Sequence, residues 1–132
     1  MLDRALAAEL DVVVWGRRET GRRNARLLER TSVDFSAPHA VRDDLRDADA
    51  IVWCLGVAQA QVTPAQYEEI AFGYTMAVAR EVAAHRPSLR FVFLSGGGAD
   101  STEKSRVRFA RTKGRTENAL FAMLSDFYCA RP

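Results

Sequence analysis

The chain has 132 residues, of which 48% are hydrophobic and 27% charged, enough for one soluble domain with a buried core. Its net charge of +2 gives no general electrostatic reason to bind nucleic acid or a membrane surface. No apolar stretch approaches the roughly 20 residues of a membrane span, and charged residues interrupt the N-terminus where a signal peptide would be apolar. We therefore expect a cytoplasmic protein with neither nucleic-acid nor membrane partners.

The first third of the chain predicts two helices and two strands. Leucines at a spacing of four indicate a helix over residues 1–10. The apolar run 11–15, ended by Gly16, is typical of a strand buried on both sides of a parallel sheet. Apolar positions within 20–30 predict a second helix, and residues 33–35 predict a short strand.

The rest of the chain alternates strands with helices. Thr63 can cap the longest helix, and Pro64 suits its first turn. Strands are predicted at 50–55, 90–94 and 127–130, and helices at 39–46, 64–85 and 104–123. This alternation predicts right-handed βαβ units and a single α/β domain over residues 1–132, with a parallel sheet and helices on both faces.

The two cysteines, Cys54 and Cys129, each lie inside an apolar run. This placement favours a reduced pair, buried on two strands, over a disulfide. A reducing cytoplasmic setting agrees with that interpretation.

Ligands of open parallel sheets bind beyond the carboxyl ends of the strands. The residues that the chain places there are richer in glycine and polar groups than the strands before them. They are Gly16, Arg17, Arg18, Asp34, Phe35, Cys54, Leu55, Gly56, Ser95, Gly96, Gly97, Gly98, Arg131 and Pro132. We expect them to form the rim of a ligand site.

Arg17 and Arg18 follow the first strand, where a dinucleotide-binding fold recognises the adenosine ribose. An acidic residue at that position would bind a 2′-hydroxyl, whereas an arginine accommodates a 2′-phosphate. Both arginines precede the first acid, Glu19, which favours NADP(H) over NAD(H). The alternative is a solvated basic helix face, which these two would form with Arg22, Arg23, Arg26 and Arg30.

Several other features have plain structural interpretations. Gly96–Gly98 lacks the G-x-G-x-x-G spacing and no helix follows at once, so an irregular loop is favoured over a phosphate loop. Lys113 has polar neighbours, so its spacing alone favours a surface lysine. Residues 100–103 predict a capping cluster, with Ser101 or Thr102 as the cap. The two histidines have no partner spacing and indicate no metal site.

Two stretches, Phe93–Lys104 and Phe109–Asn118, closely resemble a known family. They are similar to atypical short-chain dehydrogenases, and among these to small NAD(P)-binding proteins of the nucleoside-diphosphate-sugar epimerase type. The resemblance covers nearly the whole chain, because Val13–Arg18, Val33–Phe35, Cys54–Gly56 and Arg131–Pro132 also fall in register. It implies a Rossmann-like fold, a dinucleotide cofactor and oxidoreductase or epimerase chemistry on an unidentified small molecule.

The resemblance also implies roles for the matched residues. Ser95 would hold a substrate carbonyl or hydroxyl. Lys113 would hold the nicotinamide ribose and lower the pKa of a tyrosine, since a cation stabilises a phenolate. The implied cofactor contacts are Gly16, Arg17 and Arg18, Asp34 and Phe35 on the adenine side, Cys54, Leu55 and Gly56 as the wall beside the cofactor, Lys113, and Arg131 and Pro132 beside the nicotinamide.

The chain departs from the family in two places. Phe109 stands where the tyrosine of the Tyr-x-x-x-Lys pair would be, and phenylalanine has no proton to give, so the usual general acid–base is absent. No first strand and no Gly-x-x-Gly-x-x-Gly loop precede Leu2. In the 3-2-1-4-5-6 order that strand is central, and its loop would cradle the pyrophosphate.

A missing central strand would leave the strands at Val12 and Ile51 with unpaired edges. Three explanations remain open: a start assigned too late, a fragment truncated from a longer protein, or a sheet that closes differently. In the last case Val12 pairs directly with Ile51, or a second chain completes the sheet in a homo-oligomer.

Two functions follow from these observations. The first is an NADP(H)-binding, oxidoreductase-like protein with weak or no turnover. The second is a non-catalytic Rossmann-like interaction or sensor module, which Phe109 and the absent glycine loop favour. The third interpretation is a truncated remnant with no independent function, in which case no cofactor is bound.

Overall fold

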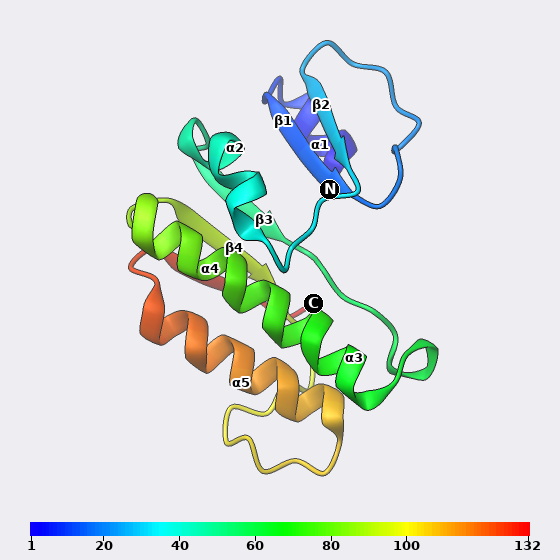
Figure 1. Cartoon of the computed structure of the whole chain (residues 1–132), viewed down its shortest axis with the longest axis vertical. Helices are drawn as coiled ribbons and strands as arrows, with labels where there is room; N and C mark the ends of the chain where they lie inside the picture. Colours follow the sequence, from blue (N-terminus) through cyan, green and yellow to red (C-terminus); the bar gives the residue numbers. More distant parts are fainter. The chain divides into compact units, whose positions relative to one another are not determined.

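The computed structural model describes the backbone of residues 1–132 and every side chain except that of Pro38. The chain forms two compact units, Met1–Asp34 and Phe35–Pro132 (Figure 1). None of the helices in the described part of the chain is long and apolar enough to cross a bilayer.

The first unit contains one short helix and a two-stranded parallel sheet. Helix α1 spans Leu2–Ala7 and confirms the predicted opening helix, although it ends three residues earlier. Strands β1 (Val12–Gly16) and β2 (Leu27–Thr31) pair in register from Val12 with Leu27 to Gly16 with Thr31. Val13 is 42% exposed, so β1 is not buried on both sides as its apolar run predicted.

The predictions for the second helix and second strand are wrong. Residues 20–30 form no helix, because Leu27 and Leu28 lie in β2, where the backbone pairs with β1. The few apolar residues of this segment do not make a helical stripe, so tertiary pairing decides its structure. The strand predicted at 33–35 is also absent, since β2 ends at Thr31 and Ser32 adopts a left-handed φ of 60°.

The second unit contains a three-stranded parallel sheet in the order β3-β4-β5. Its strands are β3 (Ala50–Trp53), β4 (Arg90–Leu94) and β5 (Phe127–Ala130), and they confirm the predicted ones to within two residues. The helical segments are η1 (Pro38–Val41), α2 (Arg42–Arg46), η2 (Gln59–Gln61), α3 (Pro64–Glu68), η3 (Glu69–Gly73), α4 (Tyr74–His85) and α5 (Arg108–Met123). Strand β1 belongs to the sheet of the first unit and β3 to the sheet of the second.

The long helix predicted at 64–85 is confirmed, with one irregularity. Thr63 and Gln66 form a capping box, in which Thr63 Oγ1 accepts from Gln66 N (3.2 Å) and Gln66 Oε1 accepts from Thr63 N (2.9 Å). Between α3 and α4 the turn η3 is a π-helix, which the sequence did not predict. Such turns recur at functional sites.

The core of this unit lies on one face of the sheet. Figure 1 shows α4 and α5 side by side along β3, β4 and β5. Successive strand residues point to opposite faces, so Trp53, Phe91 and Phe93 are buried, whereas Val52 is 48% exposed. Trp53 Nε1 donates a buried hydrogen bond to Thr75 Oγ1 at 2.8 Å, which ties β3 to α4.

Candidate functional site

A pocket of about 220 Å³ lies at the carboxyl ends of β3 and β4. Its walls are the segment after β3, the end of β4, the α3–η3 segment and the first turns of α5. The pocket brings together six residues that the sequence proposed for the site: Cys54, Leu55, Gly56, Ser95, Phe109 and Lys113.

Lys113 is buried in the pocket wall. The residue is only 8% exposed. Its Nζ donates a hydrogen bond to Leu94 O at 3.2 Å and lies 4.5 Å from the centroid of the Phe93 ring. The surface position favoured by its polar neighbours is therefore wrong, because α5 turns this residue toward β4. Burial lowers the pKa of Lys113, and the negative charge of Glu117 partly opposes that shift.

This burial predicts a pH dependence of stability. Because the pKa of Lys113 is lower in the folded than in the unfolded chain, the unfolded state binds more protons between the two values, and the free energy of unfolding rises with pH there. As the pH is raised from neutral to about 10, we expect the free energy of unfolding of the wild type to increase relative to that of Lys113→Met. Urea denaturation measures it. The exposed Lys104, changed to methionine, is the control, and equal slopes for both variants would contradict burial of the charge.

Ser95 follows β4 directly and continues its pairing, since its backbone N donates to Ala130 O at 2.8 Å. The residue is 8% exposed, and its Oγ has no hydrogen-bond partner among the described residues. A buried hydroxyl without a partner costs about 1–3 kcal/mol. Because Ser95 lines the pocket, a group bound there can remove that cost.

Phe109, in the first turn of α5, lies against Gly96 at the start of the loop after β4. A Cβ added to Gly96 would lie 2.5 Å from Phe109 Cζ, so only glycine leaves room for the ring. Residues 96–107 contain no helix, which confirms the irregular loop predicted from the three glycines.

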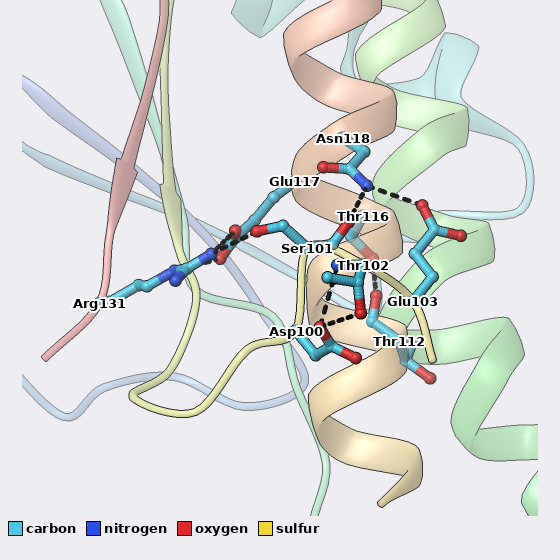
Figure 2. Close-up of polar contacts among 9 residues, drawn as sticks. All are labelled: Asp100, Ser101, Thr102, Glu103, Thr112, Thr116, Glu117, Asn118 and Arg131. Carbon is cyan, nitrogen blue, oxygen red and sulfur yellow. Dashed lines mark hydrogen bonds and ion pairs between the residues drawn. The ribbon is translucent and has the colours of Figure 1, made fainter. Parts of the chain in front are cut away.

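Asp100 organises that loop (Figure 2). Its carboxylate accepts from Thr102 Oγ1 (2.7 Å) and from the backbone N of Thr102 (2.9 Å), Lys104 (3.0 Å) and Ser105 (2.7 Å), and these bonds lower the pKa of Asp100. The predicted helix cap at Ser101 or Thr102 is wrong, because α5 begins only after Val107, which makes no side-chain cap.

A buried ion pair ties α5 to the end of β5 (Figure 2). Glu117, one turn beyond Lys113, is 3% exposed, and both its oxygens accept from Arg131, with Nε to Oε1 at 3.0 Å. Arg131 also donates to Ser101 Oγ at 3.1 Å, and Asn118 donates to Ser101 O at 2.9 Å. Burial alone would raise the pKa of Glu117, but the hydrogen bond and charge of Arg131 lower it.

Glu117 is a residue that the sequence analysis missed. Its spacing of four from Lys113 was the available signal, because it puts both residues on one helix face. The pair with Arg131 also positions Pro132, whose carbonyl oxygen would lie 3.2 Å from a Cβ added to Gly97. Arg131 and Pro132 therefore lie beside the loop after β4.

The remaining candidate residues are distributed over both units. Gly16 ends β1, and Arg17 and Arg18 follow it as exposed side chains. Asp34 ends the first unit. Phe35, in the second unit, packs edge-on against Trp53 with ring centroids 5.2 Å apart.

The alternative of a basic helix face is wrong, because residues 17–26 are not helical. Arg22 and Arg26 instead form surface ion pairs, with Asp3 and Asp11 respectively. No described residue forms an ion pair with Arg17 or Arg18.

The two cysteines are free thiols, as expected. The expected burial of both is wrong, because β3 ends at Trp53 and Cys54 is exposed beyond it. Cys129, in β5, is half-buried, and burial together with the neighbouring Glu117 raises its pKa to about 11. No cluster of metal-binding side chains is found among the described residues.

No protein-family model matches the sequence, and no curated protein matches it. Solved structures do. UDP-glucose 4-epimerase of Thermotoga maritima, solved with UDP-glucose, matches with a TM-score of 0.76 and 14% identity over 98% of this chain and 50% of its own. WbmH of Bordetella bronchiseptica, solved with NAD+, matches with a TM-score of 0.75 and 16% identity over 98% and 49%.

A hypothetical dTDP-4-dehydrorhamnose reductase of Sulfolobus tokodaii matches with a TM-score of 0.65 and 12% identity over 98% of this chain and 50% of its own. At these identities the likeness shows the fold. The chain spans about half the length of these proteins, and over that length it has the Rossmann-like α/β fold that they share, as the sequence resemblance predicted.

Proposed function

We propose that residues 1–132 act as one NAD(P)-binding domain of an epimerase- or reductase-like protein, with weak or no turnover in this form. The observation that carries the proposal is the pocket that unites Ser95, Lys113 and Phe109 beyond two parallel strands. The fold-sharing WbmH was solved with NAD+, which supports a nicotinamide dinucleotide as the cofactor. A cytoplasmic location belongs to the same proposal and is supported by the two free thiols.

The described side chains fit such a cofactor. Nζ of Lys113 uses one N–H on Leu94 O and keeps two for ribose hydroxyls or a substrate oxygen, and Ser95 Oγ is without a partner. The bound nicotinamide would supply the hydride chemistry. Lys113 would hold its ribose, and Ser95 would orient a substrate carbonyl or hydroxyl.

Phe109 is the reason to propose weak or no turnover. It occupies the position from which a tyrosine would exchange a proton with the substrate oxygen, and its ring has no exchangeable proton. A non-catalytic binding or sensor module is therefore the second candidate. Measurable reduction of an aldehyde or ketone panel that is lost in Lys113→Ala would decide for turnover.

Arg17 and Arg18 support NADP(H) over NAD(H). Both are exposed directly after β1, and neither has an ion-pair partner among the described residues. A planar guanidinium group matches the geometry of a phosphate. Other arginines of the segment, Arg22 and Arg26, already face carboxylates.

Replacing Arg17 and Arg18 together by alanine is expected to weaken NADPH binding at least tenfold and to leave NADH binding within twofold. Each lost hydrogen bond between charged groups is worth about 1.5–3 kcal/mol. Titration followed by NADPH fluorescence measures both cofactors. Arg23→Ala, an exposed arginine of the same segment, is the matched control. Absence of saturable binding at millimolar NADPH would reject the cofactor proposal.

We also propose a homo-oligomer. Among the described strands, β1 pairs only with β2 and β3 only with β4, which leaves each with an edge able to pair. A monomer in light scattering would contradict this.

A further inference from the structure

The polar side chains that line the pocket can all donate a hydrogen bond. They are the thiol of Cys54, the phenol of Tyr67, the hydroxyl of Ser95 and the ammonium of Lys113. No aspartate or glutamate is among the described lining residues. A lining of this kind is complementary to a ligand that carries hydrogen-bond acceptors and negative charge.

Lys113 supplies a buried positive charge without a paired anion. Its one hydrogen-bond acceptor is the neutral carbonyl of Leu94, and below it lies the Phe93 ring. The nearby carboxylate of Glu117 is held by Arg131, so those two charges balance each other. One unit of positive charge therefore remains for the pocket, where a low dielectric strengthens its attraction for an anion.

Two hydroxyls line the same pocket as that charge. Ser95 Oγ is buried and makes no hydrogen bond. Tyr67 is 2% exposed, no described residue hydrogen-bonds its phenol, and burial raises its pKa, so it stays a neutral donor. An oxyanion can accept from both, whereas a single neutral carbonyl would leave the charge of Lys113 uncompensated.

The other walls are apolar and the space is small. Leu55, Val57, Ala71 and Phe109 contribute hydrocarbon surface. The volume of about 220 Å³ is below the roughly 300–1,000 Å³ of pockets that enclose a drug-sized molecule. The space therefore suits one small acidic group on a compact apolar body.

We infer that the pocket binds the carboxylate of a small substrate, with the oxyanion at Lys113, Ser95 and Tyr67 and the apolar body against Phe109. This inference rests on the proposed function, since it makes the pocket the substrate end of a nicotinamide site. In the family that the sequence resembles, the lysine acts on a tyrosine phenolate. Here Phe109 offers no oxygen, and the ligand brings the anion itself.

Benzoate and its neutral isostere benzamide test the inference. We expect benzoate to bind the wild type at least tenfold more tightly than benzamide. The NMR shifts of the backbone amides of Ser95 and Lys113 measure both titrations. Lys113→Met should weaken benzoate at least tenfold and leave benzamide within twofold. Lys104→Met, at the only other lysine of the chain, should change neither.

Equal affinity for benzoate and benzamide, or no benzoate binding at tens of millimolar, would overturn the inference. The comparison of the two ligands uses the wild type, so it tests the inference even if Lys113→Met does not fold. Ser95→Ala is a second variant, for which we expect a loss of benzoate affinity. Running each titration with and without saturating NADPH separates the two proposals. If NADPH binds normally but benzoate is not preferred over benzamide, only the inference of a carboxylate site is rejected. If NADPH does not bind, the proposed function is rejected.

Discussion

Gly114→Ala is expected to lower the free energy of unfolding by about 3 kcal/mol or more, because no space exists for a methyl group there. An added Cβ would lie 1.8 Å from Asp100 O and 2.3 Å from Asp100 C. Both are backbone atoms of a loop that cannot easily withdraw. Asp100 N donates to Ala110 O at 2.9 Å, and the Asp100 carboxylate holds the backbone of residues 102–105.

Gly73→Ala is the matched control for this prediction. Gly73 also lies in a helical segment, but the nearest atoms to an added Cβ are 3.9 Å away. Alanine is favoured over glycine in a helix by about 0.5–1 kcal/mol, so this variant should be slightly more stable than the wild type. Urea denaturation followed by circular dichroism measures both. Equal stabilities of the two variants would show that the loop moves freely away from α5.

The second unit could be predicted from the sequence because its local patterns agree with its packing. After Arg90, residues 91–94 form an apolar run that is bounded by turns and flanked by helices, and the segment Arg90–Leu94 forms the central strand β4. Thr63 and Pro64 mark a helix start through backbone chemistry that needs no distant partner. In such segments the local and the global preferences coincide.

The first unit was harder to predict because pairing overrides its local preferences. Leu27 and Leu28 are good helix formers beside several arginines, yet they join β1 as a parallel strand. The partner of a strand in a parallel pair lies many residues away in the chain, so the sequence of the segment itself does not indicate the pairing. The predicted strand at 33–35 was displaced for the same reason.

The residues that form the candidate site could be predicted from the sequence, but the burial and balance of their charges could not. The carboxyl ends of β3 and β4 bring Cys54, Ser95 and Lys113 to one pocket, as parallel topology requires. The burial of Lys113 and the balance of Glu117 by Arg131 depend on how α5 rests on β4 and β5. Because the residues next to Lys113 in the sequence are polar, they did not indicate that its side of α5 is buried.

Arg131→Met is the second large expected effect, a loss of about 3 kcal/mol in the free energy of unfolding. The variant leaves the carboxylate of Glu117 without its cation, and the Glu117 side chain is only 4% exposed. Removing one partner of a buried ion pair costs about 3–5 kcal/mol, and the lower end applies because the Arg131 side chain is 41% exposed. Arg46→Met, which breaks the exposed pair with Asp43, should change stability by less than about 1 kcal/mol.

The charge of Glu117, rather than lost packing, is the expected cause, and two measurements separate these. Replacing Glu117 as well as Arg131 by methionine should restore most of the stability, because apolar residues of similar volume substitute well for a buried ion pair. Acid should also narrow the gap between wild type and Arg131→Met. In the wild type the pKa of Glu117 is lowered, so its stabilising contribution is present above the unfolded value near 4.3 and is lost as pH falls through the folded one. A gap that persists unchanged in acid and in the double variant would assign the effect to packing of the Arg131 side chain against the loop at Ser101.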